Sequence, residues 1–181
     1  ALPNEGYFAA SGTNVTTFGR THIWAGTGAA SRARVLRSSD SGATWQIADT
    51  PLAAGASSGI YSIAFRDPMN GFVVGGDYAK ETEKTHNLAV TRDGGATWTT
   101  VTRADGSPAL GGFRSVVSYV PGTLMVVAVG PSGADISHDD GRTWVPIFDQ
   151  QPTGSIGALA VAPSDPNVIY VGAGEAAQRP D

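Results

Sequence analysis

The sequence contains no cysteine, and this absence excludes several kinds of chemistry. Without a thiol the chain cannot form disulfides, use a thiolate nucleophile or build a cysteine metal site. The compartment stays open, because secreted and periplasmic proteins can also lack cysteine. The three histidines, His22, His86 and His138, show no metal-ligand spacing, and no dinucleotide-binding fingerprint is present. We therefore expect no metal and no cofactor.

Charge is sparse, and long hydrophobic runs are missing. Asp and Glu number 16 and Lys and Arg number 12, for a formal net charge of −4. The basic residues are scattered, which argues against a nucleic-acid partner. The longest apolar run, 124–129, is far too short to cross a bilayer, so no membrane span is predicted. The chain starts at Ala1 without methionine, and we expect a processed protein that is secreted or periplasmic.

Apolar periodicity of 3.6 residues is absent too, so long helices are not expected. What the chain has instead is glycine, at 24 of 181 residues, together with 11 prolines. That glycine share is about 13 %, against a usual ~7 %. Such a backbone turns often, which favours short strands joined by tight turns.

One motif occurs three times, as SSDSGATW at 38–45, TRDGGATW at 91–98 and SHDDGRTW at 137–144. We call these stretches box 1, box 2 and box 3. Their aspartates are 53 and 46 residues apart (93 − 40 and 139 − 93). A repeat of this length, made of strands and turns, is typical of propeller blades rather than helical solenoids. A short apolar run ending in glycine precedes each box, and a fourth run has no box after it; these runs end at Gly26, Gly75, Gly130 and Gly172.

Each repeat contains four expected strands, which is the composition of a β-propeller blade. In the second repeat they are predicted at 60–65, 72–75, 87–92 and 98–102. We therefore predict an all-β fold, a β-propeller of four-stranded antiparallel blades, as a single domain over residues 1–181. Its parts are blade 1 at about 13–52, blade 2 at about 59–103, blade 3 at about 113–149 and a half blade at about 155–174.

The boxes fall between the third and fourth strands of their repeats, where scaffold residues are expected. A Ser or Asp side chain can accept backbone N–H bonds there, and glycine supplies a backbone conformation that side chains resist. The tryptophan can pack back over the loop. No nucleophile is poised beside a base, so we assign a structural role to these residues: Ser38, Asp40, Gly42, Thr44, Trp45, Thr91, Asp93, Gly95, Thr97, Trp98, Ser137, Asp139, Gly141, Thr143 and Trp144.

The three boxes resemble the Asp-box, or BNR repeat, with the pattern S/T-x-D-x-G-x-T-W. This resemblance implies a propeller, and the motif occurs in sialidases, xyloglucanases, sortilin-type receptors and photosystem II assembly-factor-like proteins. Residues 4–144 resemble photosystem II stability/assembly-factor-like proteins, whereas residues 152–181 look more like sortilin-type or glycosidase-like BNR proteins. The change near 145–152 indicates either a composite chain or a divergent blade.

About three and a half blades are expected, but a closed propeller needs at least ~4. Three explanations stay open at this point. The chain is a fragment of a longer propeller, or several copies form a homo-oligomer that completes the ring. Alternatively, the N-terminal residues 5–12 pair beside 158–172 and close a small ring.

Catalytic candidates come from a likeness to the F/Y-R-I-P motif of sialidases, whose arginine grips a carboxylate. Here the motif is FRDP at 65–68, with Asp67 in place of isoleucine and a position after the first box. Arg66 and Arg114 are expected at comparable first-strand positions, near the central channel. Asp67, Asp77 and Glu175 are expected at strand ends where loops face the axis, and a pair of carboxylates there would suit a glycosidase-type hydrolase that acts on or binds carbohydrate. The competing interpretation is that all are solvated loop charges.

The insertion DYAKETEKTH at 77–86 is the most distinctive binding candidate. Long loops on rigid scaffolds often bind partners, although a solvated excursion is the alternative. We expect a non-catalytic scaffold that binds a protein or peptide on its loop face, as the assembly-factor resemblance implies; the alternative is a glycoside-hydrolase or sialidase-like propeller. The candidate binding residues are Asp77, Tyr78, Lys80, Glu81, Glu83, Lys84 and His86.

Overall fold

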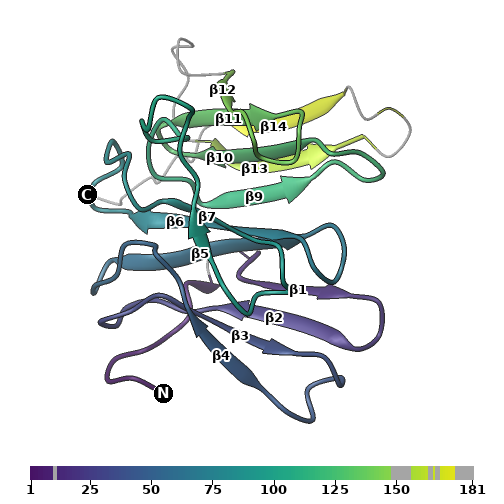
Figure 1. The fold of residues 1–181 in the computed structure, drawn as a ribbon. Coiled ribbons are helices and arrows are strands. Elements are labelled where there is room, and N and C mark those ends of the chain that lie inside the picture. Colours follow the sequence, from purple (N-terminus) through teal and green to yellow (C-terminus); the bar gives the residue numbers. More distant parts are fainter. Residues whose placement is uncertain (10–11, 148–155, 163–164, 166–167, 174–181) are drawn as a thin grey trace, which may run out of the picture.

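The computed structural model describes residues 1–9, 12–147, 156–162, 165 and 168–173 (Figure 1). Three four-stranded antiparallel sheets follow one another along the chain, and a two-stranded antiparallel hairpin comes after them. Within every sheet the strands pair in chain order, so each sheet is a simple meander. The predicted all-β fold with four-stranded antiparallel blades is confirmed. No helix in these described parts is long and apolar enough to cross a membrane.

We number the sheets as blades 1, 2 and 3. Blade 1 contains β1 (Val15–Phe18), β2 (His22–Gly26), β3 (Arg34–Ser38) and β4 (Gln46–Asp49). Blade 2 contains β5 (Ser58–Phe65), β6 (Gly71–Asp77), β7 (Leu88–Thr91) and β8 (Thr99–Thr100). Blade 3 contains β9 (Val116–Tyr119), β10 (Val126–Gly130), β11 (Gly133–Ser137) and β12 (Val145–Pro146). The hairpin, which we call the half blade, contains β13 (Ile156–Val161) and β14 (Ile169–Ala173).

The first strands of successive blades lie side by side. Ser62 of β5 forms a parallel bridge with Thr13, just before β1, and its hydroxyl accepts the Val117 N–H of β9 at 3.0 Å. The other strands of each blade extend outwards from this row, so the blades are stacked face to face (Figure 1). Because blade 2 lies between two others, β5 and β6 are buried along most of their length on both faces. In β1, at the end of the stack, most residues are exposed.

All three boxes fold in the same way. In box 2 the Thr91 hydroxyl donates to Asp93 at 2.8 Å and accepts the Gly95 N–H at 2.9 Å. The Asp93 carboxylate also accepts the Thr97 N–H at 2.9 Å and the Thr97 hydroxyl at 2.6 Å. The Trp98 indole N–H then closes the turn on the Gly95 carbonyl at 3.2 Å. Boxes 1 and 3 repeat these bonds on their equivalent residues.

These bonds keep the box aspartates ionised. For Asp40 the Thr44 hydroxyl is the main cause, and it lowers the carboxyl pKa to about 2. For Asp93 and Asp139, desolvation raises the pKa, but the hydrogen bonds within the box outweigh it and bring the pKa to about 2. The charged form of each aspartate is therefore part of the folded turn.

An aromatic ring of one blade lies under the box of the next, and we call this contact the seam. Trp24 of β2 stacks on Phe65 with ring centroids 3.7 Å apart, and its indole N–H donates to the Gly94 carbonyl of box 2 at 2.9 Å. Phe72 of β6 meets Trp144 of box 3 edge-on, with centroids 6.0 Å apart. Box glycines make room for both rings. A Cβ on Gly141 would overlap the Phe72 ring.

Among the described residues, two buried apolar clusters fill the spaces between blades. The cluster between blades 1 and 2 includes Trp24, Val35, Ile60, Val73 and Trp98. The cluster between blades 2 and 3 is built in the same way, around Phe72, Val74, Leu88, Val126 and Trp144. Each seam therefore joins an apolar core to a hydrogen-bonded turn, and burial of large rings supplies most of the attraction between blades.

The register corrects one expectation about the repeat. The first residue of each box pairs across its sheet with Ile23, Gly71 or Val126. Gly75 and Gly130 lie four residues after Gly71 and Val126, and the residue four after Ile23 is Thr27. Thr27 is therefore their equivalent, and Gly26 is one position away from it. In a strand a shift of one residue exchanges the two faces, which is why the seam rings Trp24 and Phe72 do not align in the glycine-based comparison.

The N-terminal segment does not pair beside the half blade, which was one of the three alternatives for completing the ring. Gly6 bridges to Gly28, and the Phe8 ring stacks on Tyr61 of β5 with centroids 4.1 Å apart. The Glu5 carboxylate accepts Arg34 Nε at 2.8 Å and the Thr27 hydroxyl at 2.9 Å. The segment therefore packs on blades 1 and 2, and the idea that it pairs beside the half blade is wrong.

Replacing Gly141 by alanine tests the seam. The backbone φ is +79° at Gly141 and also at Gly106, where a Cβ would meet nothing within 4 Å. Gly106→Ala should therefore cost only the roughly 1–2 kcal/mol of a left-handed alanine. Gly141→Ala should lose a further ~1–3 kcal/mol of unfolding free energy, because the new methyl group overlaps Phe72. Urea unfolding of both variants measures the difference, and equal losses would contradict the seam.

Acid should weaken the folded state through the boxes. In the native state the three box carboxyl groups have pKa values of about 2, below the ordinary value of 3.8. At a pH between these two values the native state therefore binds fewer protons than the unfolded chain. The unfolding free energy should be flat above about pH 5 and should fall steadily towards pH 2. In Asp93→Asn, urea titrations should give a shallower fall. An unchanged slope would mean that Asp93 is not held in its charged form.

Candidate functional site

The two ends of the blade stack differ in character. One end, which we call the box side, carries the boxes and the β1–β2, β5–β6 and β9–β10 turns; these turns lie on the right in Figure 1. The opposite end, which we call the loop face, carries the β2–β3, β6–β7 and β10–β11 connections and the links between blades. These connections range from two residues at 131–132 to ten at 78–87, whereas the β1–β2, β5–β6 and β9–β10 turns on the box side range from three to six, so the larger variation in length lies on the loop face.

The 78–87 connection, the longest of the three connections within blades on the loop face, is held at both of its sides. On the blade 1 side, Tyr78 N–H donates to the Ser57 carbonyl at 3.3 Å, and the His86 carbonyl accepts from Ala53 N–H at 2.8 Å. On the blade 3 side, the Glu81 carbonyl accepts the Phe113 N–H at 2.9 Å. Residues 78–86 are nevertheless exposed, so the loop presents its side chains to solvent from a fixed backbone.

An aromatic cluster supports this loop from below. The Tyr61 ring contacts Phe8, Phe113 and Tyr78, and its edge-on contacts to Phe113 and Tyr78 have centroid separations of 4.8 and 6.4 Å. Burial raises the Tyr61 pKa above its ordinary value, so the phenol stays neutral, and its hydroxyl donates to the Ser57 carbonyl. Tyr78 is 54 % exposed, as is Tyr7 at 52 %. Tyr78 thus presents an exposed ring that packs on the aromatic cluster around Tyr61.

The loop carries charges of both signs, and hydrogen bonds lower the pKa of two of its carboxyl groups. The Ser57 hydroxyl is the main cause that lowers the Asp77 pKa, and the Ala79 N–H, which donates at 2.9 Å, adds to it. The Thr85 hydroxyl lowers the Glu83 pKa. With Glu81 and the basic residues Lys80 and Lys84, the loop offers both signs of charge around Tyr78. The last of the candidate binding residues, His86, lies with Nδ1 3.0 Å from the Pro51 carbonyl oxygen.

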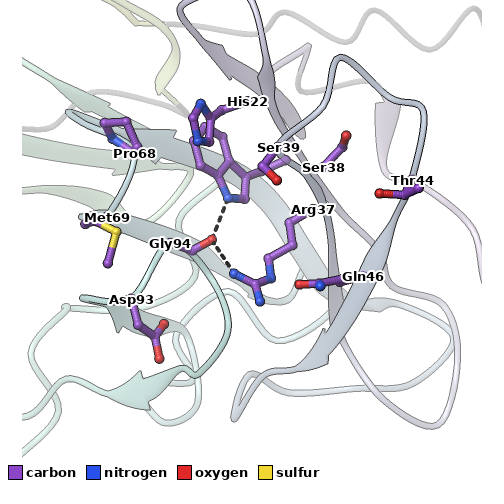
Figure 2. Close-up of a pocket in the computed structure, with 11 residues that line it drawn as sticks. His22, Arg37, Ser38, Ser39, Thr44, Gln46, Pro68, Met69, Asp93 and Gly94 are labelled. Atoms are coloured by element: carbon purple, nitrogen blue, oxygen red, sulfur yellow. Dashed lines mark hydrogen bonds between the residues drawn. The ribbon is translucent and has the colours of Figure 1, made fainter.

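A hollow lies on the box side, over the seam between blades 1 and 2 (Figure 2). Its volume is about 160 Å³, below the ~300–1,000 Å³ of typical ligand pockets. Trp24 and Arg37 both donate to the Gly94 carbonyl, at 2.9 and 3.4 Å, so the donors at its floor are used in holding the blades together (Figure 2). This hollow is therefore the outer opening of a seam.

The structure does not bring the four catalytic candidates together. Ser62 lies beside Val117, which places Arg66 beyond the end of β5 on the box side and Arg114 before β9 on the loop face. The expectation of comparable positions for these two arginines is wrong. Asp67 lies next to Arg66, and Glu175 is outside the described residues.

Arg66 takes part in the contacts between blades 2 and 3, whereas Asp67 holds the β5–β6 turn. Asp140 of box 3 accepts Arg66 Nε at 3.2 Å and Arg66 Nη2 at 3.1 Å, together with Arg92 at 2.7 Å and the Tyr119 hydroxyl at 3.0 Å. Asp67 caps its own turn by accepting from Met69 N–H at 2.8 Å. Desolvation raises the Asp67 pKa, but the hydrogen bonds to Asp67 and the charge of Arg66 outweigh it. The pKa is therefore lowered, and the carboxyl group is ionised.

Arg114 is fully buried in an ion pair with Asp135, which is also fully buried. Arg114 Nε donates to the carboxylate at 2.8 Å, and Nη1 donates to the Ser132 hydroxyl at 2.8 Å. This pair fastens the link between blades 2 and 3 to the β10–β11 turn. Within the described parts of the chain, no three His, Asp or Glu side chains gather where they could hold a metal ion.

Sequence reasoning missed three groups that organise both ends. They are the aromatic base at Tyr61, the buried Arg114–Asp135 pair and the Asp140 cluster. Members of the last are far apart in sequence, since 74 residues separate Arg66 from Asp140. A usable signal existed only for Asp140, which occupies the box position held by Ser41 and Gly94.

Asp140→Asn should destabilise the fold, because two guanidinium groups and a phenol converge on one carboxylate. We expect a loss of about 1–3 kcal/mol in unfolding free energy, measured by urea titration. Asp105→Asn is the matched control, since Asp105 lies exposed in its own loop and accepts only from Ser107. Equal stability of the two variants would mean that the Asp140 cluster does not hold blades 2 and 3 together.

Comparison with solved structures places the chain among β-propellers. It is similar to a structure described as YCF48 bound to D1 peptide, with a TM-score of 0.59, 19 % identity and coverage of 84 % of this chain and 44 % of that one. YCF48 from Cyanidioschyzon merolae matches with a TM-score of 0.54 at 18 % identity, over 82 % of this chain and 46 % of that one. The chain therefore spans less than half the length of either.

Glycosidases share the same architecture. The GH74 xyloglucanase of Xanthomonas campestris has a TM-score of 0.57 at 18 % identity, over 84 % of this chain and 25 % of that one. The GH74 enzyme of Niastella koreensis has the same TM-score at 16 % identity, over 84 % and 24 %. No protein-family model and no curated protein matches the sequence. These likenesses show the fold, and the described residues form three blades and two further strands of a β-propeller.

Proposed function

We propose that the chain is a non-catalytic scaffold that binds a protein or peptide on its loop face. The observation that carries this proposal is the 78–87 loop, which is exposed but anchored by backbone bonds to both neighbouring links. A partner meeting such a loop pays little ordering entropy, because the backbone is already in place.

Tyr78 is the expected anchor of the partner. Exposed tyrosines are enriched at binding hot spots, since they combine a large apolar ring with a hydrogen-bonding hydroxyl. The mixed charges of Lys80, Glu81, Glu83 and Lys84 surround this ring as a polar rim. The fold likeness to a peptide-bound YCF48 supports the same class of partner.

The glycosidase alternative has support from fold likeness to GH74 enzymes alone. Arg66, Asp67 and Arg114 are engaged in contacts that hold turns and blades, so a substrate would have to compete with these contacts. A screen of fluorogenic glycosides tests this alternative. Turnover that is lost in Asp67→Asn or Glu175→Gln would favour the enzyme over the scaffold.

A displayed peptide library that includes the D1 peptide provides the direct test. Peptides selected on the wild-type chain should bind Tyr78→Ala at least about 10-fold more weakly, as for a hot-spot ring. Met69→Ala is the matched control, because Met69 is 51 % exposed on the box side. Calorimetry with each variant measures the affinities. If no peptide is enriched, or if both variants lose affinity alike, the loop face is not the binding surface.

A further inference from the structure

The residue after the box aspartate differs between the two seams. In box 3 it is Asp140, whose carboxylate joins blades 2 and 3. It accepts from Arg66, from Arg92 and from the Tyr119 hydroxyl. In box 2 the same position is Gly94, which has no side chain. At this position the seam between blades 1 and 2 therefore has no acid to match the one that neutralises arginines at the next seam.

Arg37 of β3 lies beside the place where that acid would be. A Cβ built on Gly94 would stand 3.8 Å from Arg37 Nη1, so a side chain at this position would lead towards the guanidinium. Arg37 Nη1 donates to the Gly94 carbonyl at 3.4 Å, which is long for a hydrogen bond. Within the described part of the chain, no acceptor meets the other side-chain N–H groups of Arg37, and no carboxylate lies within ion-pair distance. Most of its fork is therefore open to a ligand.

Strand register directs Arg37 into the hollow over this seam. Trp24, Arg37 and Gln46 pair across β2, β3 and β4, and residues that pair in this way share one face of a sheet. That face meets blade 2, because the Trp24 indole donates to box 2. In Figure 2, Arg37 and Gln46 reach from blade 1 towards Gly94, and Met69 stands across from them on blade 2. The hollow is therefore bordered by both blades.

A guanidinium at this position is particular to blade 1. The residue directly before each box is Arg37, Val90 or Ile136. Val90 and Ile136 are apolar and pack with buried clusters. Arg37 is half-buried, so it gives up part of its hydration and gains one long bond in return. A bound anion would offset that loss.

The hollow has one polar end and apolar sides. Its volume of about 160 Å³ is small for a whole ligand but suits one functional group on a short stem. The His22 ring, which stacks on Trp24 with centroids 5.7 Å apart, lines it on the blade 1 side. On the other side Met69 is 51 % exposed, with its sulfur 4.0 Å from the Cβ that Gly94 lacks. A short hydrocarbon stem would contact these two side chains while its charged end meets Arg37.

Asp93 also lines the hollow, and its charge does not exclude an anion. Its two oxygens accept from the Thr91 and Thr97 hydroxyls at 2.8 and 2.6 Å, within box 2. Box 3 shows that two neighbouring carboxylates are compatible, because Asp139, the equivalent of Asp93, directly precedes Asp140. There the first carboxylate closes the box turn and the second meets the arginines.

We propose that the hollow binds a carboxylate group on a short apolar stem, which Arg37 holds where Asp140 stands at the next seam. The fork of a guanidinium can donate to both oxygens of a carboxylate. The Gln46 amide, which pairs with Arg37 across β3 and β4, lies beside it as a further donor. The bound group joins blades 1 and 2 from outside, as Asp140 joins blades 2 and 3 from within. This site lies on the box side, so it does not rest on the function proposed for the loop face.

Propionate tests the site, because it is a carboxylate on an ethyl stem. Titration into the isotope-labelled chain, with sodium chloride keeping the ionic strength constant, is followed by nuclear magnetic resonance. The Arg37 Nε–H signal should shift, and so should the Trp24 indole N–H, which shares the Gly94 carbonyl with Arg37. The Trp144 indole N–H, at the next seam, should not shift. We expect a dissociation constant on the order of 1–10 mM for so small a ligand.

Variants of Arg37 and a neutral ligand provide the controls. Arg37→Gln should weaken propionate binding at least about 10-fold, and Arg37→Lys, which keeps the charge but loses the fork, should weaken it less. Arg103→Gln should leave it unchanged, since Arg103 is exposed in the link between blades 2 and 3. Propionamide, which has the same shape without the charge, should cause no shift. A cooperative melt shows that each variant is folded.

Three results would overturn the proposal. The first is a wild-type chain whose Arg37 and Trp24 signals do not move with propionate up to about 100 mM. The second is an equal response to propionamide. The third is wild-type affinity for propionate in a folded Arg37→Gln chain.

A further titration separates two sources of the carboxylate. N-acetyl-glutamate methylamide carries the stem and carboxylate of propionate within a peptide unit. If it binds more tightly than propionate and loses affinity in Arg37→Gln, the hollow takes an acidic side chain of a bound peptide. If it binds more weakly than propionate, the hollow takes a free small acid, because the peptide groups then meet the walls of the opening. Each of these results supports the carboxylate site, and binding of both ligands that is indifferent to Arg37 overturns it.

Discussion

The ring under the box of the next blade is the contact on which the rest of the structure depends. A single four-stranded sheet cannot bury its apolar side chains, so each blade is stable only against a neighbour. Trp24 and Phe72 supply the buried area, and the box supplies a fixed hollow to receive it. The hollow exists because the box glycine has no side chain and because the aspartate holds the turn open around it. Charge, turn geometry and apolar packing therefore meet at one place in each repeat.

This division of labour leaves the loop face free to vary. Since the seams and the Asp140 cluster join the blades at the box side, the β2–β3, β6–β7 and β10–β11 connections can differ in length without disturbing the sheets. The 78–87 loop is the longest of these connections, and the aromatic cluster around Tyr61 supports it through contacts with Tyr78 and Phe113. Rigid support below and varied side chains above are what a binding surface requires.

Much of the fold was predictable because its signals are local. The boxes, the strand runs and the turns between them lie within a few residues of one another, and they predicted the four-stranded blades. The seams were not predictable in the same way. Which residue faces the next blade depends on strand register. An alignment of the repeats on Gly26 is wrong by one residue, and a shift of one residue exchanges the two faces of a strand. The partners of Arg66, Arg114 and Tyr61 come from other strands or from distant turns, and one sequence carries no sign of them.

The charged residues that looked catalytic illustrate the same point. An arginine that grips a substrate carboxylate must keep its fork unoccupied, or exchange a weak partner for a better one. The Arg66 guanidinium already donates two hydrogen bonds to Asp140, and Arg114 is paired with Asp135 where both side chains are fully buried. Both arginines therefore fasten a turn or a link to the blade stack. Arg66 and Asp140 join blade 2 to blade 3, whereas Arg114 and Asp135 join the start of blade 3 to its own third strand, so the two pairs stabilise the stack at opposite ends of the blades.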